Sequence, residues 1–173
     1  MLWRPFIEPM RHIISILMQN EAGALTRVTS MFSSRGYNIE SLSVAPTENP
    51  QVSRLSMVTA GSDEVIDQIN KQLFKLVDVV KITDMTMNEH FERELLLMKV
   101  KLEANANISD IVSAAGAKVL DQTPETYTVQ LTGTGTQIDD FMQTLGSRSD
   151  ILAVVRSGPM AIGSGTNILS AEL

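Results

Sequence analysis

The same order of hydrophobic patterns occurs twice along this chain of 173 residues, and this repetition constrains the fold more than any single motif. In each half a strand-like apolar run is followed by a helical pattern, two strand-like runs, a second helical pattern and a closing strand. This order is typical of the ferredoxin-like unit, an antiparallel sheet with both helices on one face. We therefore predict an α+β protein built from two ferredoxin-like βαββαβ domains.

In the first half, residues 12–18 form an apolar, β-branched run that predicts a strand, and a polar loop with Gly23 follows. Apolar residues from Leu25 to Phe32 then recur with helical spacing, and Gly36 follows as the expected helix stop.

The rest of this half continues the pattern. Residues 38–45 and 52–60 predict two strands joined by a turn with two prolines, residues 65–76 a second helix, and residues 78–87 a closing strand.

The second half has the corresponding segments in the same order. They are residues 94–102, 108–115, 118–123, 127–132, 138–145 and 151–156. We accordingly expect an N-terminal extension at residues 1–9, a first domain at 10–88, a second domain at 93–158 and a flexible tail at 159–173, the last because that segment is rich in Gly and Ser.

Composition narrows the possible partners and compartments. With 14 Lys and Arg against 20 Asp and Glu the net charge is −6, and no basic cluster occurs, which argues against a nucleic-acid partner. No apolar stretch approaches the roughly 20 residues of a membrane span, and the start of the chain does not resemble a signal peptide. The absence of cysteine fits a reducing compartment. We expect a cytoplasmic protein that does not contact membranes.

A search for catalytic groups gives weak candidates. His12 and His90 lack the spacing of metal ligands, and Asp139 and Asp140 are neighbours on a predicted helix, where they point about 100° apart. Residues 133–136, Gly-Thr-Gly-Thr, look like a truncated phosphate loop without its lysine. We therefore expect no catalytic residues, no metal and no cofactor.

The loop at residues 20–25, Asn-Glu-Ala-Gly-Ala-Leu, opens directly onto the start of a predicted helix. Backbone amides there have no partner within the helix and attract a carboxylate, and Gly23 would let a ligand approach the backbone. Asn20 and Asn38 could orient the polar end of an amino acid. In the alternative interpretation Asn20 forms a local turn, Gly23 only supplies a φ angle that other residues rarely adopt, and Asn38 merely begins a strand.

Three segments carry a resemblance to a known family: the strand from Met10, the Asn-Glu-Ala-Gly-Ala-Leu loop, and Phe32-Ser-Ser-Arg-Gly-Tyr-Asn-Ile-Glu-Ser-Leu42. Together they resemble the ACT domain of the small, regulatory subunit of acetohydroxyacid synthase, also called acetolactate synthase. The similarity extends over about residues 10–158. It departs from the family pattern mainly in residues 1–9, in residues 104–115 and in the Gly/Ser tail.

The resemblance implies a homodimeric regulatory subunit without a catalytic centre. Such a subunit binds the thiamine-diphosphate-dependent catalytic large subunit, raises its activity and confers feedback inhibition by valine, with leucine and isoleucine as possible alternative effectors. The family site, placed at the dimer interface, maps onto these residues: Asn20, Gly23, Ala24, Leu25, Asn38 and Ile39. The rival hypothesis is a stand-alone ACT module that senses an amino acid for another enzyme or regulator.

Overall fold

The computed structural model describes residues 10–102, 108–166 and 168–171. The predicted N-terminal extension, residues 1–9, lies outside the described residues. The chain divides into two compact units: the residues up to Phe91 with the segment from Ala161 onward, and Glu92–Met160. Each unit is an antiparallel sheet with two helices, which confirms the predicted α+β class.

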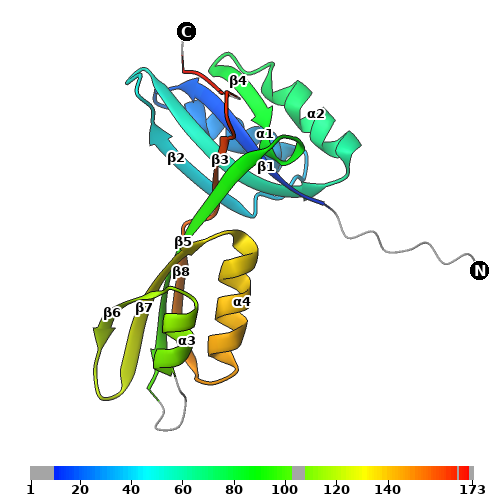
Figure 1. The fold of residues 1–173 in the computed structure, drawn as a ribbon. Helices are drawn as coiled ribbons and strands as arrows, with labels where there is room; N and C mark the ends of the chain where they lie inside the picture. Colours follow the sequence, from blue (N-terminus) through cyan, green and yellow to red (C-terminus); the bar gives the residue numbers. More distant parts are fainter. Residues whose placement is uncertain (1–9, 103–107, 167, 172–173) are drawn as a thin grey trace, which may run out of the picture. The chain divides into compact units, whose positions relative to one another are not determined.

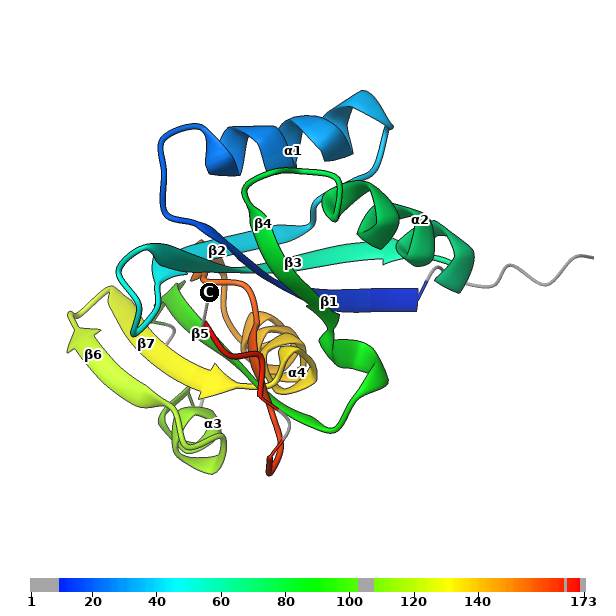
Figure 2. The ribbon, with the colours of Figure 1, turned by 90° about the horizontal axis from the view of Figure 1, so that it is seen from above.

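The first unit contains β1 (Met10–Gln19), β2 (Ser41–Pro46), β3 (Val52–Gly61) and β4 (Val79–Asp84), hydrogen-bonded in the order β2-β3-β1-β4. Helices α1 (Ala24–Ser34) and α2 (Asp63–Leu73) lie on the same face of this sheet (Figure 1 and Figure 2), and a short 3-10 turn, η1 (Met85–Met87), follows β4. The strands therefore have the ferredoxin-like topology that the repeated pattern predicts.

Helix α1 buries the apolar stripe that its spacing predicts, including Val28 and Phe32, against the sheet. The helix ends at Ser34, and Gly36 follows it with a left-handed φ of 71°, while the Tyr37 N–H still donates to the Phe32 carbonyl at 3.0 Å. Because this bond holds the chain against the helix end, β2 begins at Ser41. The prediction of a strand from residue 38 was wrong by three residues.

The C-terminal segment covers the other face of the first sheet, where we had expected a flexible tail. Met160–Gly163 forms β9, which pairs with β5 (His90–Lys101), and Ala161 is buried with Ile13, Val58 and Met85.

Further along, three side chains of the first unit hold the backbone of the same segment. Arg54 donates to the Leu169 carbonyl at 2.6 Å, Lys81 to that of Ser170 at 3.1 Å and Asn49 to that of Ala171 at 3.4 Å. Two small residues of this segment, Ala161 and Ala171, pack on the sheet, which the Gly/Ser-rich composition concealed.

The second unit has β6 (Lys118–Gln122), β7 (Thr126–Gly133) and β8 (Ile151–Arg156) with β5 in the order β6-β7-β5-β8, and helices α3 (Ile108–Ala114) and α4 (Gly135–Gly146). Its core joins alternate residues of β5 and β7 to apolar residues of both helices. Residues 103–107 lie outside the described residues, and 104–107 of them belong to the segment expected to depart from the family pattern.

Candidate effector site

The loop between β1 and α1 is anchored by backbone bonds to neighbouring segments. The Gln19 N–H donates to the Asp78 carbonyl and the Asn20 N–H to the Gln51 carbonyl, both at 2.8 Å. Gly23 stands immediately before α1 with a left-handed φ of 89°, a conformation that favours glycine. The loop is thus held in one geometry at the point where the helix begins.

No side chain caps the start of α1 in the described structure. The Ala24 N–H donates to the Glu21 carbonyl at 3.2 Å, a turn within the loop, and Leu25 is 37% exposed. An uncapped helix start combines free amide donors with the positive end of the helix dipole. The arrangement can therefore accept a carboxylate from outside, with an apolar side chain beside it.

Asn20 is exposed, and its Nδ2 donates to the Pro50 carbonyl at 3.0 Å. It lines a hollow of about 330 Å³ between this loop and the β2–β3 loop, together with Gln19, Glu21 and Gln51. Of the six expected site residues, this hollow includes Asn20 alone. The carbonyl oxygen of the Asn20 side chain stays available as an acceptor.

The remaining expected residues differ in exposure. Ala24 is 1% exposed and its side chain belongs to the core, so only its backbone can face a ligand. Asn38 is exposed, and its carbonyl accepts from Thr59 Oγ1 at 2.6 Å, while Ile39 is partly buried against the core. Both lie in the passage between α1 and β2. The single chain leaves these groups on an open surface.

An ion pair that the sequence analysis missed lies beside Gly23. Arg27 binds the carboxylate of Asp78 through two nitrogens, one of them Nη2 at 2.8 Å from Oδ1, and Asp78 is 3% exposed. The guanidinium holds the pKa of Asp78 below its usual range. A Cβ at position 23 would lie 3.0 Å from Nη1 of Arg27. The two partners are far apart in sequence, and no local pattern connects them.

The weak catalytic candidates have structural roles. His12 is buried, and its Nδ1 lies 2.7 Å from Oδ2 of Asp84. Asp139 accepts from Arg156 at 2.7 Å. Within the described residues no group of three or more metal-ligating side chains occurs.

The Gly-Thr-Gly-Thr segment caps a helix. The Thr134 side chain accepts from the Gln137 N–H at 3.3 Å, and Gln137 Oε1 accepts from the Thr134 N–H at 2.9 Å. Because this capping box fills the start of α4, the segment has no open amides of the kind found at α1.

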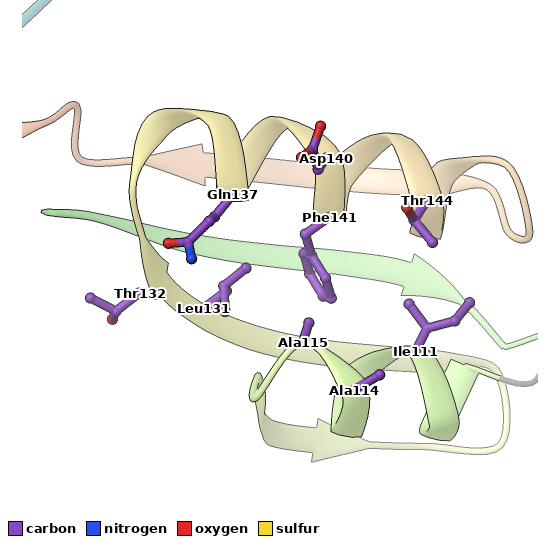
Figure 3. A pocket seen from close by; sticks show the side chains of 9 residues that line it. All are labelled: Ile111, Ala114, Ala115, Leu131, Thr132, Gln137, Asp140, Phe141 and Thr144. Atoms are coloured by element: carbon purple, nitrogen blue, oxygen red, sulfur yellow. The ribbon is translucent and has the colours of Figure 1, made fainter. Parts of the chain in front are cut away.

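The second unit contains a hollow of about 470 Å³ between α3, α4 and β7. Figure 3 shows that Phe141, Leu131 and Ile111 point toward it, whereas the carboxylate of Asp140 points away. None of the expected effector residues lines it.

The fold and the open helix start define a class of protein, an ACT-type ligand-binding domain joined to a second ferredoxin-like domain. A family model described as AHAS small subunit-like ACT domain matches residues 14–81, and one described as small subunit of acetolactate synthase matches residues 93–165. The chain belongs to the family of acetolactate synthase small subunits. The resemblance noted in the sequence is thereby confirmed.

Relatives of this family match the chain over nearly its whole length. Acetolactate synthase isozyme 3 small subunit of Salmonella typhimurium is 42% identical over 162 residues, which are 92% of this chain and 99% of the relative. The probable acetolactate synthase small subunit of Methanothermobacter thermautotrophicus is 35% identical over 166 residues, 94% of this chain and 98% of the relative.

A solved structure shows the same fold. The crystal structure of the acetolactate synthase small subunit from Thermotoga maritima has a TM-score of 0.78 and 32% identity, and the match covers 88% of this chain and 96% of that chain. No helix among the described residues is both long enough and apolar enough to span a membrane.

Proposed function

We propose that this chain is the non-catalytic regulatory subunit of a cytoplasmic acetolactate synthase in branched-chain amino acid biosynthesis. It binds the thiamine-diphosphate-dependent catalytic large subunit, raises its activity and confers feedback inhibition by valine. The observation that carries the proposal is that both domains match the small-subunit family, the second by a model specific to that subunit. This match favours the regulatory subunit over a stand-alone ACT sensor, which would need only the first domain.

The proposed effector site lies between two copies of the first domain. The amides at Gly23 and Leu25 would hold the valine carboxylate, joined by the Ala24 amide when its bond to the Glu21 carbonyl gives way to the ligand. Asn20 and Asn38 would orient the polar end of the valine.

The exposed Leu25 and the partly buried Ile39 would form apolar walls. Two features of the single chain support a homodimer. Asn20, Gly23, Leu25 and Asn38 are exposed, and β2 pairs only with β3, which leaves its other edge unpaired within the described sheet.

Valine would inhibit by favouring the dimer arrangement that binds it more tightly, which shifts the attached catalytic subunit toward a less active state. The coupling is reciprocal. The catalytic subunit must therefore change the affinity for valine by the same factor by which valine changes the affinity for the catalytic subunit.

The test is reconstitution with the catalytic subunit, with valine titrated calorimetrically and by activity. Asn20→Ala should abolish valine binding and inhibition while activation remains. Asn88→Ala is the matched control, because Asn88 Nδ2 also donates to a backbone carbonyl at 3.0 Å from an exposed position. Loss of activation together with inhibition in Asn20→Ala would show that the residue serves folding. Parallel titrations with leucine and isoleucine rank the effectors.

A further inference from the structure

Helices α1 and α2 leave a groove of about 490 Å³ between them on the outer side of the first unit. The rim along α1 carries hydroxyl groups at Thr26, Ser30 and Ser34, which recur every fourth residue and so face α2 together. Met31 and Leu76 form an apolar floor. Figure 2 shows the two helices side by side above the sheet. The groove is separate from the hollow at Asn20.

Two cations converge at one end of the groove on a single neutral atom. Arg35 Nη2 lies 3.0 Å and Lys75 Nζ 3.5 Å from Oε1 of Gln72. Among the residues that the structure describes, neither cation is paired with a carboxylate, whereas Arg27 binds Asp78 and Lys71 binds Asp67 at 2.5 Å.

Arg35 Nη1 also donates to Ser34 Oγ at 3.4 Å. These bonds occupy few of the donors that a guanidinium and an ammonium offer. In a chain with a net charge of −6, this is a local cationic site with unused hydrogen-bond donors.

Two large apolar side chains stand exposed in the turn that also carries Lys75. Phe74 is 61% and Val77 is 82% exposed, on either side of Lys75 and Leu76 in the turn after α2. Aromatic residues and arginine are both enriched in protein interfaces. A small anion could neutralise the cations but could not cover Phe74 and Val77. The surface therefore fits a protein segment better than a free phosphate or carboxylate.

We infer that Arg35, Gln72, Phe74, Lys75 and Val77, here called the α1–α2 surface, dock an acidic segment of the catalytic large subunit whose carboxylates are flanked by apolar side chains. The inference rests on the proposed function and names the contact surface for it. Arg35 follows the end of α1, about 17 Å from the proposed effector loop at the helix start at 1.5 Å per residue, and it precedes the proposed effector residue Asn38 by three positions. One helix thus connects valine binding to the partner.

The test compares two charge-reversed full-length variants that change the net charge equally. Arg35→Glu with Lys75→Glu alters the α1–α2 surface. Lys118→Glu with Arg148→Glu alters exposed cations of the second unit. We expect the first variant to bind the catalytic subunit at least about tenfold more weakly and to lose salt dependence, and the second to bind as the unmodified chain does. Equal weakening of both would overturn the inference, because any added negative charge would then suffice.

Phe74→Ser tests the apolar half of the α1–α2 surface. A separate variant carries a photo-crosslinking amino acid at position 74 and identifies the segment that this position contacts. The crosslinked peptide should come from the catalytic subunit and be rich in Asp and Glu. A crosslink to a second copy of this chain would overturn the assignment.

Valine calorimetry and the dimer mass separate the possible failures. Both should be unchanged in Arg35→Glu with Lys75→Glu. If that variant binds the catalytic subunit as the unmodified chain does, the assignment of the α1–α2 surface is wrong, but the proposed function stands. Failure of the unmodified chain to bind the catalytic subunit overturns both.

Discussion

Strands β1 and β5 occupy the same position in the two sheets, yet their burial differs. Every residue from His12 to Met18 in β1 is buried, whereas in β5 Leu96, Met98 and Val100 are buried and the residues between them are not. In the first unit the helices cover one face of the sheet and the C-terminal segment the other. Burial rather than composition distinguishes the two strands, since β5 also has an apolar run at residues 95–98, of which only alternate side chains are buried. The same strand order therefore occurs in a sheet whose central strand is buried on both faces and in one whose central strand is buried on one face only.

Core truncations should separate the two units most clearly. Phe32→Ala and Phe141→Ala each remove a buried ring from a different apolar cluster, and each should cost about 3–5 kcal/mol in its own unit. Hydrogen exchange by mass spectrometry should show loss of protection confined to the mutated unit. Equal loss in both units would mean that the cores unfold as one cooperative block.

The buried ion pair of the second unit should give the next largest effect. Glu94 is 2% exposed, and Arg156 binds its two oxygens at 2.7 and 2.9 Å. Arg156→Ala leaves this carboxylate buried without a partner, at a cost of about 2–3 kcal/mol, reduced from a fully buried pair because Arg156 is 34% exposed. Urea unfolding measures it.

Two further variants control this measurement. Adding Glu94→Leu to Arg156→Ala should restore part of the stability, because the unpaired carboxylate is gone. Arg148→Ala, at an exposed position, should change the free energy of unfolding by less than about 0.5 kcal/mol. No recovery in the double variant would contradict the pairing argument.

Deleting residues 160–173 tests what makes β1 different from β5. The deletion uncovers apolar side chains such as Ile13, Leu17 and Val58, so the first unit should lose on the order of 2 kcal/mol. Amide exchange in β1 should accelerate. Ile168→Ser is the control, because Ile168 is 75% exposed in the same segment. Unchanged amide exchange in β1 after the deletion would show that the C-terminal segment does not protect this strand.

Periodicity predicted nearly every helix and strand, because burial on one face leaves a repeat of two or 3.6 residues in the sequence. What it missed depends on contacts between distant segments. The ion pair of Arg27 and Asp78 joins residues 51 positions apart, and β9 packs through a few small residues such as Ala161. In the single chain Asn20 lies beside Gln51 at one end of β3 and Asn38 beside Thr59 toward the other end, so the expected site residues are not brought together. A shared valine site would need a second copy, which a single sequence does not describe.

The smallest effect concerns the pH dependence of the first unit. Arg27 lowers the folded-state pKa of Asp78, so this pair stabilises the fold above the unfolded pKa of about 3.9, and the contribution is lost as the pH falls through the folded pKa. Asp78→Asn should therefore be less stable than the unmodified chain at pH 7. The two free energies of unfolding should converge below about pH 3, where a protonated Asp78 resembles asparagine. Arg27→Gln should also flatten the dependence of the free energy of unfolding on pH, because Asp78 then lacks the cation that lowers its pKa. A difference between Asp78→Asn and the unmodified chain that stays constant from pH 7 to pH 2 would mean that the carboxylate stabilises by shape rather than by charge.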